Sequence, residues 1–247
     1  MTIGLIGYGR FGRLAAKSLA SQARVLVFDK RSTRGVTGSR RIVSASLADV
    51  AASDVVVLAV PVSSLREVLR EIRSHVRPGS LVIDVCAVKV EPVKWMRQIL
   101  PRGVSILGTH PFFGPDSASG GLKGHRIVLC PVRTPPRLLA QVTKVLRGRG
   151  LEVQVMSPVL HDRMVAETIF LTQHIGRLVH VAGLKRWPRS TTNYDRLLSI
   201  VEAARHDSVE LFADMWKFNP RARRVAMALE RAHKRLQKER VQLRRLR

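Results

Sequence analysis

Short apolar runs alternate with amphipathic segments from the start of the chain to about residue 155. The runs are typical of strands, and the segments between them repeat apolar residues three and four positions apart, as helices do. Strands are therefore predicted at residues 3–6, 25–28, 55–59, 81–84, 104–109, 126–130 and 152–155. This alternation indicates an α/β fold with a doubly wound, mostly parallel sheet.

The segment after residue 61 has a clear helical pattern. Ser64 and Glu67 match a capping box just after Pro61, which predicts the start of a helix at this point. The apolar residues of this segment follow helical spacing: Leu65, Val68, Leu69, Ile72 and Val76.

A different pattern begins at Ser157-Pro158. Serine at an N-cap followed by proline at the first helical position is a strong helix start. Beyond it no convincing strand is found, and helices are predicted over about 158–182, 193–217 and 220–247. We therefore expect an α/β domain at residues 1–156 and an all-helical domain at residues 157–247.

Charge adds a second observation. The chain of 247 residues has 43 Lys+Arg against 18 Asp+Glu, a formal net charge of +25, and the 33 arginines are spread through every segment. A general arginine bias of the source, anionic small substrates and polynucleotide binding each account for such an excess. Basic stripes interleaved with aromatic residues are absent from the sequence, and so is zinc-finger spacing, which disfavours nucleic acid as a partner.

Location is indicated by the hydrophobic residues and the cysteines. No run approaches the roughly 18 apolar residues of a membrane-spanning helix, and the first residues read as a strand rather than a signal peptide. Cys86 and Cys130 lie at the ends of apolar runs, where buried thiols in a reducing compartment are expected. These features predict a cytoplasmic protein without membrane contact.

Three glycines form a G-x-G-x-x-G pattern between the first strand and the next helix: Gly7, Gly9 and Gly12. Asp29 ends the following strand, 22 residues after Gly7. This context is the fingerprint of a dinucleotide-binding, Rossmann-type domain. The expected dinucleotide-binding residues are Gly7, Gly9, Arg10, Phe11, Gly12, Asp29, Lys30, Arg31, Val60 and Pro61.

The choice between NAD and NADP depends on the residues around Asp29. A carboxylate at this position hydrogen-bonds the 2′-hydroxyl of the adenosine ribose and repels a 2′-phosphate, which favours NAD. NADP stays an alternative, because neighbouring polar and basic residues offer contacts to such a phosphate: Lys30, Arg31, Ser32 and Arg34. No metal site is predicted.

A histidine follows the apolar run at 104–109. At the carboxyl end of a strand in a doubly wound sheet, His110 lies on the edge where ligands bind. A neutral imidazole in that place can accept a proton during a reaction.

With these residues the sequence resembles the prephenate/arogenate dehydrogenases of tyrosine biosynthesis, and it is closest to their arogenate-type branch. The His-Pro-x-Phe-Gly-Pro-Asp run is the specific part. The resemblance implies a Rossmann-type domain followed by an all-α dimerisation domain, hydride transfer to NAD(P)⁺ with loss of CO₂, and a homodimer formed through the C-terminal helices. It is carried by Gly7–Gly12, Asp84–Lys89, His110–Asp116, Ser157–Asp162 and Asp207–Phe212.

The resemblance also implies roles for single residues. His110 corresponds to the catalytic histidine, and Lys89 and Gln173 are further catalytic candidates. The implied substrate-binding residues are His110, Asp116, Gln173, His174, Arg177, Tyr194, Arg196 and Glu202. For Asp116, capping of a turn is an equal alternative.

The sequence departs from the family pattern at two positions. Ala87 stands where the family usually has Ser, and Gln173 where it often has His. Glu202 stands where prephenate-specific relatives have Arg, which favours arogenate over prephenate as the substrate. Two alternatives remain: another NAD(P)-dependent dehydrogenase or imine reductase of the same two-domain plan, or a catalytically weak dinucleotide-binding module that binds polyanions.

Overall fold

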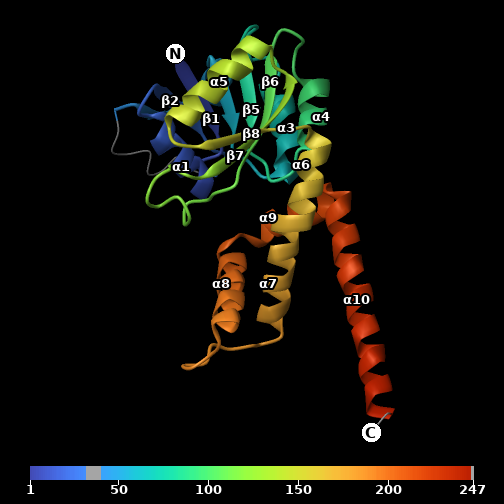
Figure 1. Ribbon diagram of the computed structural model, residues 1–247. Helices are drawn as coiled ribbons and strands as arrows, with labels where there is room; N and C mark the ends of the chain where they lie inside the picture. Colours follow the sequence, from blue (N-terminus) through green and yellow to red (C-terminus); the bar gives the residue numbers. More distant parts are fainter. Residues whose placement is uncertain (32–39, 246–247) are drawn as a thin grey trace. The chain divides into compact units, whose positions relative to one another are not determined.

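The computed structural model describes the backbone of residues 1–31 and 40–245 (Figure 1). The chain forms two compact units, Met1–His161 and Asp162–Arg247, which we call the N-terminal unit and the helical unit. The division falls a few residues after the boundary expected from the sequence, inside a helix that begins at Pro158. In the described part of the chain, every helix is too short or too polar to cross a membrane.

The N-terminal unit is built on an eight-stranded sheet with strand order β3-β2-β1-β4-β5-β6-β7-β8. All neighbouring strands are parallel except β6 and β7, which confirms the predicted fold class. The strands are β1 (Thr2–Ile6), β2 (Arg24–Phe28), β3 (Ile42–Ser44), β4 (Val55–Leu58), β5 (Leu81–Asp84), β6 (Ser105–Pro111), β7 (Arg126–Arg133) and β8 (Glu152–Val155). The sequence did not predict β3, because three partly exposed residues give no apolar run.

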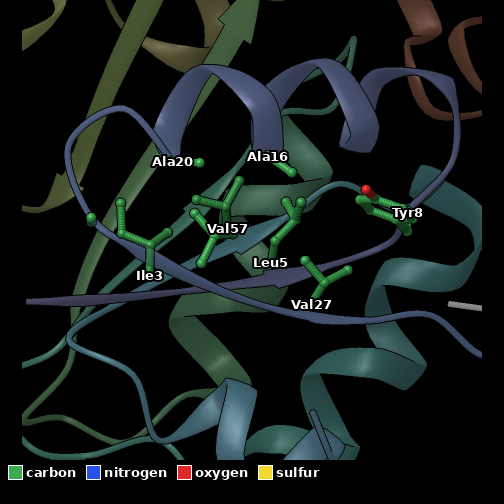
Figure 2. Packing of buried hydrophobic residues seen from close by; sticks show 9 residues of the cluster. Ile3, Leu5, Tyr8, Ala16, Ala20, Val27 and Val57 are labelled. Atoms are coloured by element: carbon green, nitrogen blue, oxygen red, sulfur yellow. The ribbon is translucent and has the colours of Figure 1, made fainter. Parts of the chain in front are cut away.

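Helices cover both faces of this sheet. Those of the N-terminal unit are α1 (Arg10–Leu19), α2 (Leu47–Ala51), α3 (Val62–Ile72), α4 (Val90–Ile99) and α5 (Pro136–Gly148). Helices α1 and α5 share one face, because the apolar clusters under both include Val55 of β4. Figure 2 shows Ala16 of α1 and Ala20, the C-cap of α1, lying over Leu5 and Val57 of the strands. Burial of these side chains provides the main stabilisation of this layer.

The opposite face packs closely because two strand residues lack side chains. A Cβ atom at Gly4 would lie 2.0 Å from the carbonyl oxygen of Val50 in α2. A Cβ atom at Gly108 would lie 2.8 Å from Val93 in α4. Both helices can therefore approach the backbone of the sheet directly.

Parallel pairing brings the ends of several strands to one edge. Ile6 of β1 is in register with Phe28 of β2 and with Leu58 of β4, and Leu58 is in register with Asp84 of β5. The loops that follow these strands therefore gather at the carboxyl edge of the sheet, which is where open α/β sheets bind ligands.

Helix α3 begins earlier than the sequence predicted. Its N-cap is Pro61, and the Ser64 N–H already donates to the Pro61 carbonyl oxygen at 3.1 Å. The capping box proposed for Ser64 and Glu67 is therefore wrong. The Glu67 side chain instead forms an ion pair with Lys30.

Only helices follow β8 in the described part of the chain: α6 (Pro158–Val165), the π-helical turn η1 (Ala166–Phe170), α7 (Leu171–Val181), α8 (Thr192–His206), α9 (Val209–Phe218) and α10 (Pro220–Arg245). The predicted start at Ser157 is confirmed, because its Oγ accepts the Leu160 N–H at 3.2 Å. The single helix predicted over 193–217 is wrong. Asp207 and Ser208 are extended, and the Ser208 side chain caps α9 by accepting the Leu211 N–H at 3.1 Å.

Candidate functional site

The loop after β1 has the geometry that the glycine pattern predicts. Gly7 adopts φ +100°, and a Cβ atom there would lie 2.3 Å from the Ala59 carbonyl oxygen. A Cβ atom at Gly12 would lie 2.1 Å from the Gly7 carbonyl oxygen. Both positions therefore require glycine: Gly7 for its backbone conformation and close approach, and Gly12 so that α1 can pack against the loop.

The space around Gly9 is open, whereas Gly7 and Gly12 are closely surrounded by other atoms. A Cβ atom at this residue would meet nothing within 4 Å. Gly9 is the N-cap of α1, receives no side-chain cap, and is followed by a first turn without acidic residues. The start of α1, with the positive end of the helix dipole, therefore borders accessible space at Gly9, which fits the pyrophosphate of a dinucleotide.

Asp29 lies at the end of β2 with both carboxylate oxygens held by the main chain. Oδ2 accepts the Tyr8 N–H at 2.6 Å, and Oδ1 accepts the Arg31 N–H at 2.8 Å. These bonds fix the carboxylate beside the glycine loop. A carboxylate has about four acceptor positions, so Asp29 can still accept a ribose hydroxyl.

The charge of Lys30 is engaged by two carboxylates. Its Nζ lies 3.0 Å from Glu67 Oε1 and 2.8 Å from Glu71 Oε1, both on α3. The hydrogen bonds that Lys30 donates to Glu71 and then Glu67 raise the pKa of Lys30 above its usual value. A 2′-phosphate would have to compete with both carboxylates for this cation. Ser32 and Arg34, also considered for that phosphate, lie outside the described residues.

Val60 and Pro61 connect β4 to α3, and Val60 Cγ1 would lie 3.1 Å from a Cβ atom at Gly7. Val60 therefore lies beside the glycine loop, and Pro61 follows it in the chain. Both are partly buried.

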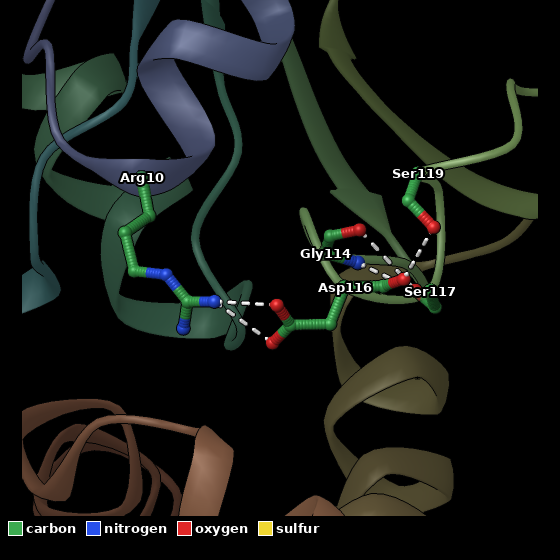
Figure 3. Close-up of polar contacts among 5 residues, drawn as sticks. All are labelled: Arg10, Gly114, Asp116, Ser117 and Ser119. Atoms are coloured by element: carbon green, nitrogen blue, oxygen red, sulfur yellow. Dashed lines mark hydrogen bonds and ion pairs between the residues drawn. The ribbon is translucent and has the colours of Figure 1, made fainter.

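Arg10 and Asp116 join the start of α1 to the loop after β6. Arg10 Nη2 donates to both carboxylate oxygens of Asp116, at 2.6 and 2.8 Å (Figure 3). The rings of Phe11 and Phe113 lie 6.3 Å apart alongside this ion pair. The Asp116 carboxylate thus binds the arginine of the glycine loop. Two segments identified separately in the sequence are brought together here.

His110 lies on β6, opposite Val128 of β7, and is 8% exposed. Its Nδ1 lies 2.9 Å from His161 Nε2, and the edge of Phe112 packs against its ring. Burial lowers the pKa of His110 well below 6.5, and the nearby His161 and Lys89 lower it further. The imidazole is therefore neutral near pH 7 and able to accept a proton.

Lys89, a catalytic candidate implied by the resemblance, lies in the interior of the N-terminal unit. Its Nζ forms an ion pair with Asp84, and both side chains are completely buried. The Cys86 N–H also donates to Asp84 Oδ1 at 3.0 Å. Gly108 leaves room for this pair, since a Cβ atom there would lie 3.2 Å from Lys89 Cδ. Lys89 therefore acts on His110 through its charge in this structure. The predicted burial of both cysteine thiols is confirmed.

His161 is the residue that sequence reasoning missed. It was noted only as part of the segment Ser157–Asp162, without a role. The signal available was local: the N-cap at Ser157 places residue 161 in the first turns of α6. No spacing indicates its contact with His110, which lies 51 residues earlier in the chain.

In the helical unit, two candidate residues meet around Asp207. The Gln173 Nε2 atom donates to Asp207 Oδ2, and Arg177 Nη2 donates to the main-chain oxygens of Asp207 and Ser208 at 3.2 and 3.3 Å. Gln173 is 6% exposed, and its Oε1 has no hydrogen-bond partner among the described residues. A buried amide oxygen without a partner is uncommon in a folded chain, which makes Gln173 a candidate for a functional role.

His174 belongs to a separate aromatic cluster. Its ring stacks on Phe170 at 5.6 Å, on Phe212 at 6.1 Å and on Trp216 at 6.5 Å between centroids. Burial lowers the pKa of His174, while the charge of Glu230 opposes that shift. One residue along the helix thus separates an amide bound to Asp207 from an imidazole bound to aromatic rings.

The three candidates on α8 have other contacts. The Tyr194 hydroxyl donates to the Lys185 carbonyl oxygen at 2.7 Å, and Glu202 forms an ion pair with Arg186 at 3.1 Å. Arg196 is exposed. Tyr194 and Glu202 therefore hold the segment that precedes α8. In the part of the chain that the structure describes, no three His, Cys, Asp or Glu side chains group as metal ligands.

Comparison with known proteins adds to this geometry. The family model described as prephenate dehydrogenase, nucleotide-binding domain, matches residues 15–155, and the model described as TYRAAT1-like, C-terminal domain, matches residues 178–244. The chain is 31% identical over 251 residues to arogenate dehydrogenase 1, chloroplastic, of Arabidopsis thaliana. It is 29% identical over 249 residues to arogenate dehydrogenase 2, chloroplastic, of the same plant.

Each of these two matches covers 97% of this chain, which spans 39% of the first relative and 70% of the second. A solved structure of prephenate dehydrogenase from A. aeolicus, in complex with hydroxyphenyl propionate and NAD⁺, is similar with a TM-score of 0.77 and 21% identity. That match covers 98% of this chain and 91% of the solved one. The structural similarity shows a common fold.

Proposed function

Since the chain belongs to the prephenate dehydrogenase family, we propose that it is an NAD-dependent enzyme that oxidatively decarboxylates arogenate, with prephenate as the alternative substrate. The observation that carries this proposal is the buried, neutral His110 at the ligand-binding edge of a sheet whose first loop fits a dinucleotide. The two Arabidopsis relatives named arogenate dehydrogenases support the same reaction.

In the proposed mechanism, the backbone of Gly7–Gly12 and the start of α1 hold the pyrophosphate, and Asp29 accepts a ribose hydroxyl. NAD⁺, when bound, supplies the hydride acceptor. His110 Nε2 accepts the proton of the ring hydroxyl as the hydride leaves the same carbon. The ring carboxylate departs as CO₂, and its bonding electrons complete the aromatic ring. Because His110 is buried, its lone pair is available for this transfer near pH 7.

Preference for arogenate is supported by the acceptors of the helical unit. Gln173 has a buried amide oxygen without a partner among the described residues, and Asp207 adds a carboxylate beside it. Acceptors of this kind suit the ammonium group of arogenate better than the keto group of prephenate. Glu202 was the earlier candidate for this contact, but its carboxylate is bound to Arg186.

Preference for NAD over NADP is supported by two features. Asp29 places a negative charge where a 2′-phosphate would bind, and Lys30 is held by Glu67 and Glu71. Repulsion by the Asp29 carboxylate and neutralisation of the Lys30 charge both disfavour binding of a 2′-phosphate.

The test is reduction of NAD⁺ and NADP⁺, each measured with arogenate and with prephenate. We expect the highest kcat/KM for arogenate with NAD⁺, and CO₂ release in step with reduction. Reduction of the cofactor by an unrelated hydroxy acid, with neither of these substrates turned over, would contradict the proposal. Polynucleotide binding that falls steeply with salt would then point to the polyanion-binding alternative.

We further propose a homodimer formed through the helical unit. Support comes from the large apolar side chains that this unit exposes: Leu178, Val181, Leu184, Trp187, Val209, Trp216, Met227 and Leu236. Burial of such a set against a second copy is favourable. Light scattering should give a mass about twice 27.6 kDa, and Val181→Lys should shift the protein toward 27.6 kDa. A fully active monomer would contradict this assignment.

The cytoplasm is the proposed compartment, since both cysteines are buried and neither forms a disulfide. Fractionation of the source cells tests this proposal. Activity that sediments with membranes or is secreted would contradict it.

A further inference from the structure

Two imidazole rings from distant parts of the chain meet inside the N-terminal unit. His110 Nδ1 and His161 Nε2 are 2.9 Å apart, which is hydrogen-bond distance. His110 is 8% exposed and His161 is completely buried. Their ring centroids lie 5.1 Å apart at an interplanar angle of 62°. The contact therefore joins specific ring nitrogens and is not a face-to-face stack.

Only one proton can lie between these two nitrogens. If His161 Nε2 carries it, His110 Nδ1 is the acceptor, and neutral His110 has its own proton on Nε2. If His110 Nδ1 carries it, His161 Nε2 is the acceptor, and His110 Nε2 has a free lone pair. The proposed reaction requires the second arrangement, because a base must present an unprotonated nitrogen to the substrate hydroxyl.

We propose that His161 is a positioning residue that accepts the Nδ1–H of His110 and thereby keeps the lone pair of His110 Nε2 available. Nothing in the family match assigns this role, and its effect on turnover rests on the proposed function. The neutral tautomer of one ring is thus set by the tautomer of the other, as in sites where a second group orients a catalytic histidine.

The surroundings of His161 suit a fixed acceptor. Its main-chain N–H donates to the Ser157 carbonyl oxygen at 3.0 Å, within the first turns of α6. Phe112 lies against both rings, with centroids 4.8 Å from His110 and 6.3 Å from His161. Packing on this side limits rotation of either imidazole, so the distance between the two nitrogens is set by the fold.

The pair of His110 and His161 can take up one added proton but not two. When His110 Nε2 takes a proton, its Nδ1–H donates a charge-assisted hydrogen bond to neutral His161. A second added proton would place two cations at hydrogen-bond distance. Lys89, paired with Asp84, is the other cation that lowers the pKa of His110. His161 therefore stabilises the imidazolium formed in the reaction only while it stays neutral itself.

The test compares three variants of the full chain. His161→Phe keeps a ring but removes the acceptor, whereas His161→Gln puts an amide oxygen near the position of Nε2. His75→Phe, on an exposed residue of the N-terminal unit, is the matched control. We expect kcat with arogenate to fall about 10- to 100-fold in His161→Phe, the range seen when the hydrogen-bond partner of a metal-bound histidine is removed. His161→Gln should recover part of that loss, and His75→Phe should match the parent.

A spectroscopic measurement makes the result independent of turnover. ¹⁵N NMR of the histidine rings reports which nitrogen of His110 is protonated, in the protein without substrate. We expect Nδ1–H in the parent and in His161→Gln, and a mixture of tautomers in His161→Phe. The affinity for NAD⁺, measured by equilibrium titration, should be the same in all four proteins.

The outcomes separate this inference from the proposed function. Turnover of arogenate by a parent whose His110 carries its proton on Nε2 would overturn the role of His161 and leave the enzyme assignment intact. A parent with Nδ1–H but without dehydrogenase activity would overturn the enzyme assignment and leave the tautomer intact. Unchanged kcat and an unchanged tautomer in His161→Phe would also overturn the proposal.

Discussion

The two units of this chain hold their functional polar groups in different ways. In the N-terminal unit, Asp29 accepts two main-chain N–H groups, and His110 has a fixed partner in His161. In the helical unit, the Gln173 amide oxygen is buried without a partner in the described chain. Val181 and Trp187 of that unit are 84% and 70% exposed. Asp29 and His110 of the first unit therefore have partners within that unit, although Asp84 Oδ2 and Arg149 Nη1 there have none among the described residues. The second unit leaves a candidate amide oxygen unpartnered and large apolar side chains exposed.

This difference separates the expected effects of substitution. Substitutions at the carboxyl edge of the sheet should lower kcat or change the cofactor preference. They should leave the affinity for the substrate unchanged. Changes in the helical unit should alter substrate affinity while leaving cofactor binding. The first three predictions below test that division, and the fourth tests the burial of His110.

The largest effect is expected at the centre of the N-terminal unit. His110→Asn removes the ring nitrogen that accepts the hydroxyl proton, and kcat should fall about 10²- to 10⁴-fold, the usual contribution of a general base. NAD⁺ affinity should be unchanged, because the glycine loop does not depend on the imidazole. Steady-state kinetics and equilibrium titration give the two numbers. Full turnover by this variant would contradict the role given to His110.

Gln173→Met tests the helical unit. It removes both the donor to Asp207 and the unpartnered amide oxygen, while the side chain keeps a similar size. Hydrogen bonds to charged groups contribute about 1.5–3 kcal/mol, so kcat/KM for arogenate should fall roughly 10- to 150-fold, mainly through KM. The matched change His174→Asn affects the aromatic cluster and should have a smaller effect. Equal losses in the two variants would contradict the separation of these neighbouring residues.

Cofactor choice is expected to shift by a moderate factor. Asp29→Ser removes the charge that repels a 2′-phosphate, so the ratio of NADP⁺ to NAD⁺ affinity should rise about 10-fold, which corresponds to about 1.4 kcal/mol. The double variant Glu67→Gln and Glu71→Gln frees Lys30 and should raise the same ratio by a smaller amount. Equilibrium binding of both dinucleotides measures these shifts. A parent that binds NADP⁺ more tightly than NAD⁺ would refute the argument from Asp29.

The smallest effect is a pH dependence of stability. The pKa of His110 is well below 6.5 in the folded chain because of burial. Between that pKa and 6.5, the unfolded chain binds a proton that the folded chain does not. The free energy of unfolding therefore rises with pH across this window and decreases as the pH falls through it.

Urea unfolding at a series of pH values tests this dependence. His110→Asn should show a weaker loss of stability below pH 6.5 than the parent, and the same stability trend above it. A parent whose unfolding free energy is constant below pH 6.5 would show that His110 is not held neutral.

The sequence predicted those structural features that depend on residues close to one another in the chain. Gly7 and Gly12 were identified because a tight loop and close helix packing require glycine at fixed spacing. The helix start at Ser157 followed from its own side chain. By contrast, strand β3 was missed because its three residues depend on pairing with β2 for their conformation.

Site contacts between distant segments were the least predictable. His161 meets His110 across 51 residues, and Gln173 meets Asp207 across 34 residues. Lys89 was a catalytic candidate, and no pattern in the sequence indicated that its side chain is completely buried. The carboxylate of Asp84 and the missing side chain of Gly108 explain its burial, and both come from other strands.

The π-helical turn at Ala166–Phe170 joins α6 to α7 within a continuous helical stretch. Such a turn holds one residue more than the α-helical turn it replaces, while the helix on each side keeps its own phase. A lineage can therefore gain or lose a single residue here without rotating Gln173 away from Asp207. Alignments that count residues instead of turns are expected to slip by one position across this stretch. Equivalent residues of related proteins are therefore better matched along this helix by the direction of their side chains than by their residue numbers.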